Sequence, residues 1–94
     1  LTIATSLTDV ATATRVALYP NPATSQLHVI LDAQEAGLHT VVIMDLAGKV
    51  TYSTEVAVNG LQNISIPVSN LANGYYMVSV EANGNRSVQK FVKQ

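Results

Sequence analysis

The fold is easiest to recognise in residues 38–58, which read LHTVVIMDLAGKVTYSTEVAV. The nearly continuous apolar run at 41–44 is typical of a strand that is covered on both sides or that lies at the centre of a sandwich. A short loop follows at 45–49, where Gly48 can adopt a positive φ. Residues 50–58 then alternate, so that every second side chain would face a core. The pattern predicts a β-hairpin.

Further short strands are predicted around this hairpin, at residues 16–19, 26–31, 64–68, 75–82 and 86–93. Asn59-Gly60 and Asn83-Gly84-Asn85 are strong turn signals between them. The chain therefore has about seven predicted strands, with turns roughly ten residues apart and no credible helix. This rhythm predicts an all-β fold, a single antiparallel β-sandwich of immunoglobulin-like architecture.

Prolines mark the places where strands should stop. Pro20 and Pro22 lack a backbone N–H and restrict the residue before them, so the strand at 16–19 must end there and the chain should leave the sheet in an extended conformation. Pro67 indicates the end or the exposed edge of its strand. After it, Leu71 is expected to drop from the crossover into the core.

Composition limits the classes of function. The chain has 94 residues, of which 48% are hydrophobic and 12% charged, and its formal net charge is −1. A domain of this size has one core, and its charge is too low to cause disorder or to attract nucleic acid. Zero cysteines exclude a disulfide framework and a thiolate metal site. No apolar run is long enough for a transmembrane helix.

The beginning of the chain differs from the rest. Residues 1–15 are rich in threonine and alanine and show little apolar periodicity, so they are predicted to be a linker or the tail of a preceding domain. Residues 16–94 are predicted to form the folded domain. The chain starts with Leu1 and carries no basic segment ahead of an apolar one, so no N-terminal signal peptide is expected. The simplest interpretation is a C-terminal piece of a longer protein.

Catalytic chemistry is not expected. His28, Asp32 and His39 are the ionisable residues that could suggest a metal site, but zinc needs three or four convergent ligands with further support. Only His28 and Asp32 share a strand face. The hydroxyl side chains have no nucleophile elbow and no evident base. A small hydrolase would have to depend on His28 or His39, and we expect neither an enzyme nor a cofactor.

The end of the chain is harder to explain by structure alone. In the last strand Val88, Lys90 and Val92 would share one face, with Phe91 on the other. One interpretation is an edge strand whose lysines discourage aggregation. The other is that a receptor pairs with this exposed edge by strand addition. An exposed edge would also allow dimerisation.

Four motifs together resemble the type A C-terminal sorting domain of the type IX secretion system in Bacteroidota. They occur in family order and spacing over about Val16 to Lys93, and they are residues 19–24 (YPNPAT), 42–49 (VIMDLAGK), 71–78 (LANGYYMV) and 90–93 (KFVK). The resemblance implies a secretion signal that carries a cargo protein through the periplasm and across the outer membrane, to the cell surface or the medium.

The resemblance also implies partners. They are an outer-membrane type IX translocon and a sortase-like cysteine peptidase, which commonly removes such a domain at the cell surface. The cargo is then joined to anionic lipopolysaccharide or released. Cleavage would fall within residues 1–15.

The implied recognition or sorting motif has no catalytic, metal or cofactor-binding member and comprises Tyr19, Pro20, Asn21, Pro22, Asp45, Gly48, Lys49, Gly74, Tyr76, Lys90, Phe91, Val92 and Lys93. Within it, Gly74 would permit the turn, Tyr76 and Phe91 would anchor the last two strands, and Lys90 and Lys93 would be exposed recognition charges. The alternative function is a structural or glycan-binding β-sandwich module at the end of a surface protein. A sugar-binding platform would need several coplanar exposed rings, and the chain has four tyrosines, one phenylalanine and no tryptophan.

Overall fold

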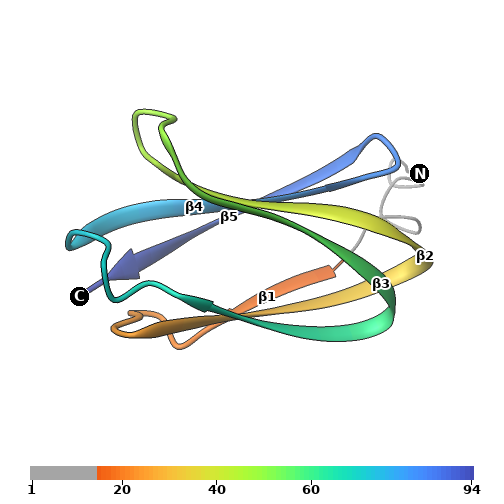
Figure 1. The fold of residues 1–94 in the computed structure, drawn as a ribbon, viewed down its shortest axis with the longest axis horizontal. Coiled ribbons are helices and arrows are strands. Elements are labelled where there is room, and N and C mark those ends of the chain that lie inside the picture. The colour runs from red at the N-terminus through yellow and green to blue at the C-terminus, as the bar shows by residue number, and fades with distance from the viewer. Residues whose placement is uncertain (1–14) are drawn as a thin grey trace, which may run out of the picture.

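A computed structural model describes residues 15–94, apart from the side chains at positions 34 and 35. The described chain folds into antiparallel strands and loops (Figure 1). The strands are β1 (Arg15–Tyr19), β2 (Gln26–Asp45), β3 (Val50–Pro67), β4 (Gly74–Ala82) and β5 (Asn85–Lys93). Their order is β1-β2-β4-β5, and β3 pairs with β2. The all-β antiparallel prediction is confirmed.

The strand count is five rather than about seven, because two pairs of predicted strands are continuous. Residues 26–31 and 38–45 both belong to β2, and residues 50–58 and 64–67 both belong to β3. The turn predicted at Asn59-Gly60 is wrong. Gly60 does adopt a positive φ of 79°, but it bends β3 without ending it, because β2 follows alongside through an irregularity between Ala33 and Gly37.

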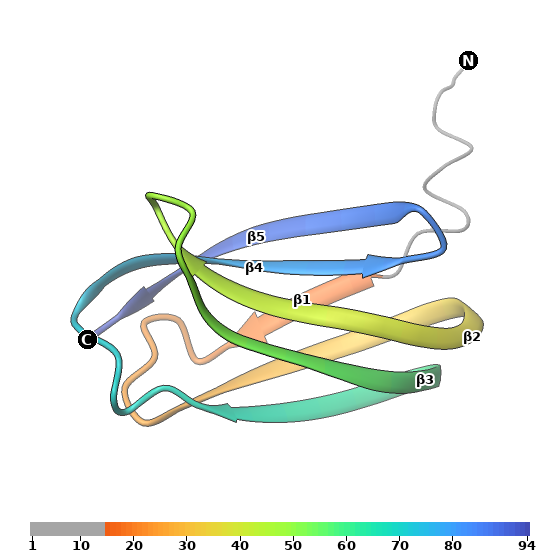
Figure 2. The same ribbon diagram turned by 45° about the horizontal axis from the view of Figure 1, so that its top comes forward.

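The bend divides the long β2–β3 hairpin between two layers, with the core between them (Figures 1 and 2). In one layer, residues 26–33 of β2 pair with β1 and with the second half of β3. In the other layer, residues 37–45 of β2 pair with the first half of β3 and with β4, which in turn pairs with β5. The hairpin recognised in the sequence therefore holds both layers together.

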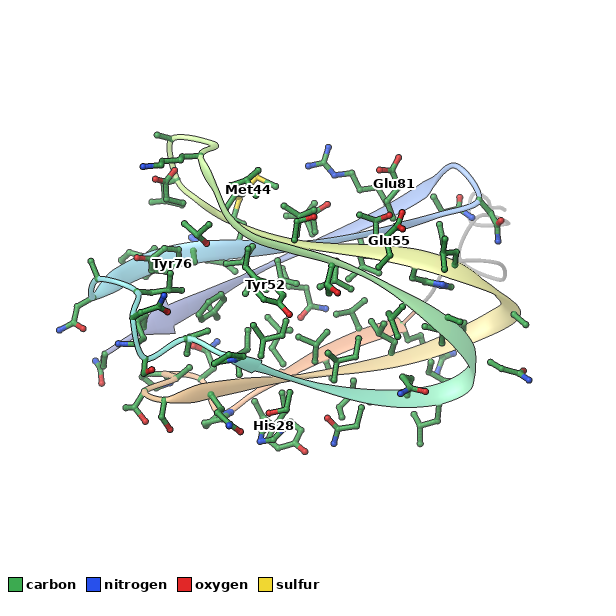
Figure 3. The ribbon with its side chains drawn as sticks, in the orientation of Figure 1. His28, Met44, Tyr52, Glu55, Tyr76 and Glu81 are labelled. Carbon is green, nitrogen blue, oxygen red and sulfur yellow. The ribbon has the colours of Figure 1, made fainter. Side chains whose placement is uncertain are left out.

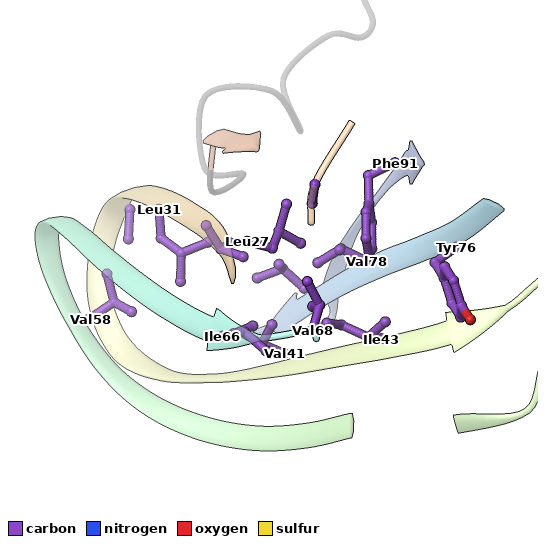
Figure 4. Close-up of a cluster of buried hydrophobic side chains, with 14 residues drawn as sticks. Leu27, Leu31, Val41, Ile43, Val58, Ile66, Val68, Tyr76, Val78 and Phe91 are labelled. Carbon is purple, nitrogen blue, oxygen red and sulfur yellow. The ribbon is translucent and has the colours of Figure 1, made fainter. Parts of the chain in front are cut away.

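Alternation along each strand fills the space between the layers (Figure 4). Leu27, Val29 and Leu31 face it as predicted, and each is fully buried. Burial of such a side chain contributes about 1.5–3 kcal/mol. The core comprises Ala23, Leu27, Val29, Leu31, Ala33, Val41, Ile43, Val58, Ile66, Val68, Tyr76, Val78, Val80 and Phe91. Leu71 is only half-buried against this core, and Val68 is the fully buried residue of that connection.

The apolar run at 41–44 lies at the centre of its sheet, between β3 and β4. Val41 and Ile43 are fully buried in the core. Val42 and Met44 are half-buried on the outer face of the same layer, where no described element covers them. Met44 projects from this outer face together with Glu55 and Glu81 (Figure 3). Of the two predicted settings, the central strand position is the one that the structure has.

Candidate recognition site

The four sequence motifs lie at one end of the sandwich. The β2–β3 turn, the β1–β2 loop, the β3–β4 connection and the end of β5 all occupy the end marked C in Figure 1. β1 begins at Arg15, farther from this end than Tyr19, where it stops (Figure 1). The structure thus gathers segments that are far apart in the sequence into one region.

The β1–β2 loop is bonded directly to the last residues of the chain. The Val92 N–H donates to Asn21 Oδ1 at 3.0 Å, and the Ala23 N–H donates to the Val92 carbonyl at 2.8 Å. The Gln94 N–H donates to the Ala23 carbonyl, also at 2.8 Å. We call these four residues the terminal clasp. The clasp joins the motif at 19–24 to the motif at 90–93.

The clasp has a compact loop behind it. The Tyr19–Pro20 and Asn21–Pro22 peptide bonds are both cis, and residues 20–22 form a bend instead of the expected extended exit. Ala23 is fully buried and makes a parallel bridge with Lys93. A side chain larger than that of alanine would meet the core here, which explains the small residue after Pro22.

The edge of the terminal strand is therefore not available where the sequence suggested a receptor would pair with it. Residues 92–94 already pair with the β1–β2 loop. Farther along β5, Gln89 Nε2 donates to the Val16 carbonyl of β1 at 2.5 Å. These bonds close the gap between β1 and β5, and they correct the expectation of an exposed edge at the tail.

Two aromatic rings anchor the last two strands, as predicted. Phe91 is fully buried and stacks on Tyr76, with ring centroids 5.6 Å apart and planes 24° apart. The Tyr76 hydroxyl donates to the Ala72 carbonyl at 2.7 Å. The pair thus connects the end of β5 to the β3–β4 connection. Gly74, with a φ of 150°, opens β4 between them.

The two tail lysines differ in their surroundings. Lys90 is exposed, and its ammonium lies 5.5 Å from the centroid of the Tyr75 ring. Lys93 is only 6% exposed, so the expectation of an exposed charge is wrong for this side chain. The physical reason is the alternation of β5, in which position 93 has the same parity as the fully buried Phe91, so the Lys93 side chain is on the inner face of the strand.

The β2–β3 turn is organised by one carboxylate. Asp45 Oδ1 accepts hydrogen bonds from the Ala47 and Lys49 N–H groups, each at 2.9 Å. The Gly48 N–H donates to the Asp45 carbonyl at 3.0 Å, and Gly48 has a φ of 89°. Asp45 and Gly48 therefore shape the turn, and the exposed side chain of Lys49 is its charged group.

The histidines lie apart. His28 stacks on Tyr19 on the outside of one layer, with ring centroids 4.8 Å apart (Figure 3). His39 is 1% exposed, and its Nδ1 lies 3.1 Å from the Gly37 carbonyl. Among the side chains that the structure describes, no three His, Asp or Glu groups lie together where they could hold a metal ion, and this part of the chain has no pocket.

Exposed aromatic rings do not gather on one surface. Tyr19 and Tyr75 are both about half exposed, but they lie on strands of different layers and point away from the core. A flat sugar-binding platform would need them side by side. In the part of the chain that is described, nothing helical has the length and apolarity that crossing a bilayer requires.

Sequence reasoning found the motifs but missed how they are connected. Ala23, Ala72 and Gln94 were not among the candidate residues, although each supplies a backbone group to this region. The available signal was the asparagine between two prolines. Its side chain can accept a hydrogen bond from a backbone that prolines leave without regular partners.

Comparison with known families agrees with the motif order. Residues 17–94 match the family described as "Secretion system C-terminal sorting domain". The match begins within β1 and includes the whole clasp, the motifs at 71–78 and 90–93, and the β2–β3 turn. No curated protein matches the chain.

Proposed function

The chain belongs to the family of secretion system C-terminal sorting domains, and we propose that its four motifs form one recognition site at the clasp end of the sandwich. The family serves the type IX secretion system, marks proteins for the cell surface or for release across the outer membrane, and is not catalytic. The type IX machinery is accordingly the partner of this domain.

The observation that carries the proposal is the terminal clasp. Asn21 and Val92 are 71 positions apart and joined by a hydrogen bond. A receptor that contacts one motif would therefore also meet the other. The readable signal is a folded surface, and neither motif alone would present it.

Within this surface we assign the charged contacts to Lys49 and Lys90, because both side chains are exposed. Tyr76 and Phe91 hold the surface in shape from inside. Lys93 has a structural place beside Ala23 instead of a free charge. The recognition residues implied by the family thus divide into contact residues and supporting residues.

We also assign processing to residues 1–15, ahead of the sandwich. Arg15 begins β1, and Tyr19 ends it next to the β1–β2 loop, which belongs to the terminal clasp. A sortase-like cysteine peptidase could reach the Arg15 end while the translocon holds the clasp end. Attachment of the cargo to anionic lipopolysaccharide, or its release, would follow cleavage.

The test is surface delivery of a reporter. Residues 16–94 are fused to a periplasmically exported reporter in a host with a type IX system. We expect Lys90→Ala to reduce delivery with at most a small drop in melting temperature, which comes from the lost contact with the Tyr75 ring. Arg86→Ala is the matched control, because Arg86 is a basic residue on the same face of β5. Delivery that survives deletion of residues 90–94 would contradict the proposal.

A further inference from the structure

The outer edge of β3 is the longest strand edge that no described strand covers. β3 has 18 residues and pairs only with β2 among the described strands. It runs along one border of the molecule, away from β5 (Figure 2). An uncovered edge presents backbone donors and acceptors that can pair with another strand. We call this border of β3 the open edge.

The hydrogen bonds of the clasp identify which groups of the first half of β3 point outward. The Val92 backbone faces the loop, so by alternation the Phe91 backbone faces Tyr76 on β4. The same alternation, continued through β4 and β2, turns the Tyr52 backbone toward Ile43. The N–H and C=O groups that face the open edge are then those of residues 51, 53, 55 and 57.

The orientation of the second half of β3 follows from another backbone hydrogen bond. The Val68 N–H donates to the Ser25 carbonyl, so residues 66, 64 and 62 face β2 in turn. Residues 61, 63 and 65 face the open edge. Pro67 comes next in this series, and the N–H that proline lacks is one that would have pointed outward. Pro67 thus ends the open edge at a position where a proline removes no bond within the sheet.

The sequence protects the other border but not this one. β5 carries the exposed basic residues Arg86 and Lys90, whereas Glu55 is the one charged residue of β3. Tyr52, Val56 and Ile64 of β3 pack against the core but remain half-buried. A strand added at the open edge would satisfy the backbone groups and also cover these side chains.

We propose that the occupant of the open edge is the β3 strand of a second copy of this chain. Antiparallel pairing about a two-fold axis at Asn59 places Ser53 opposite Ser65 of the second copy and Glu55 opposite Asn63 of the second copy. In this register, a residue that lies a given number of positions before Asn59 is opposite the residue that lies the same number after it in the second copy. The backbone groups that face the open edge of one copy therefore meet those that face the open edge of the other. The two Glu55 side chains stay far apart, so no like charges oppose each other.

This register also matches the shape of the strand. The bend at Gly60 lies beside the axis, so the bends of both copies coincide. The first half of β3 in one copy then pairs with the second half of β3 in the other copy and extends the layer to which that half belongs. Both layers continue from one copy into the other, and the half-buried flank of each core faces the same flank of its mate. The proposal goes beyond the sorting function and does not rest on it.

Sedimentation equilibrium of the whole 94-residue chain, from micromolar to millimolar concentration, tests the proposal. We expect a monomer–dimer equilibrium. Ser53→Pro removes one outward N–H, and the two-fold axis doubles this loss, so the dissociation constant should rise at least about tenfold. Val88→Pro is the matched control, since by the same alternation its N–H points outward from β5. A chain that is monomeric at millimolar concentration, or equal effects of both prolines, would overturn the proposal.

Cysteine pairs test the register even if a proline variant does not fold. The chain has no cysteine of its own. Ser53→Cys/Ser65→Cys brings Cα atoms to about 5.5 Å across the axis, within disulfide range. Thr51→Cys/Ser65→Cys is offset by two residues and should not bridge. We expect a covalent dimer from the first pair alone. Equal yields from both pairs would contradict the proposed register. The absence of any covalent dimer would contradict the open edge as the dimer interface.

Discussion

The two long borders of this sandwich are held in different ways. On the border of β1 and β5, side chains and loop backbone bridge the gap through the terminal clasp and through Gln89 and Val16. On the border of β3, the strand itself crosses from one layer to the other. The contrast teaches that the family motifs lie where contacts depend on particular residues. The border of β3 follows from the long pairing of β3 with β2, and no family motif lies on it beyond the turn.

The largest expected effect is on the clasped border. Phe91→Ala removes a fully buried ring that stacks on Tyr76, and it should lower the free energy of unfolding by about 3–5 kcal/mol. Urea unfolding followed by circular dichroism measures it. The control is Tyr75→Ala, an exposed tyrosine one position away from Tyr76. Similar losses for both variants would mean that the Phe91 site does not anchor the border.

The second effect belongs to the border of β3. Gly60→Ala places a Cβ where no heavy atom lies within 4 Å, so its cost comes from the backbone φ of 79° alone. That cost should be about 1–2 kcal/mol of unfolding free energy. Gly37→Ala, at the same bend of the hairpin but without a positive φ, should leave stability unchanged or slightly raised. Thermal unfolding of both variants measures the two effects. A Gly60→Ala protein as stable as the parent would show that the bend of β3 does not require the positive φ of Gly60.

A smaller effect is expected within the clasp. Asn21→Ala removes the acceptor of the Val92 N–H and should cost about 0.5–1.5 kcal/mol. Hydrogen exchange should show faster exchange at Val92, with little change at Phe91, whose N–H faces β4. Asn70→Ala, an exposed asparagine in the β3–β4 connection, is the control. Unchanged exchange at Val92 would show that the side-chain bond does not hold the tail.

The smallest effect on stability is expected at Lys90. Lys90→Gln removes an exposed contact with the Tyr75 ring, which is worth about 0.5–1 kcal/mol at most. The same variant should reduce surface delivery of the reporter, because the charge is a proposed contact. Normal delivery together with a larger loss of stability than this would reverse the assignment and make Lys90 a structural residue.

The strands were predictable because their signals are local. The alternation of Leu27, Val29 and Leu31 and the glycine turns at 48 and 84 need no knowledge of distant segments. The prediction of a turn at Asn59-Gly60 failed because a glycine with a positive φ occurs in a bent strand as well as in a turn. Only the pairing with β2 decides between them.

The candidate site was predictable as a set of motifs but not as a surface. The alternation that places Phe91 inside also places Lys93 inside, but its parallel bridge with Ala23, seventy residues upstream, lies outside every strand pattern. The identity of Asn21 gave a local hint of a side-chain acceptor, but its partner Val92 could not be inferred from spacing. Long-range backbone contacts of single residues are the part that a single sequence leaves open.

The terminal clasp has a consequence for the order of events in the cell. The ribosome adds Val92 and Gln94 after all the residues that lie before them in this chain, yet these two residues fasten the loop at 21–23. The border of β1 and β5 therefore cannot close while the tail is still being made or is still in transit. A truncated or stalled chain would lack the closed border. The clasp therefore forms only in a chain whose preceding residues have all been synthesised.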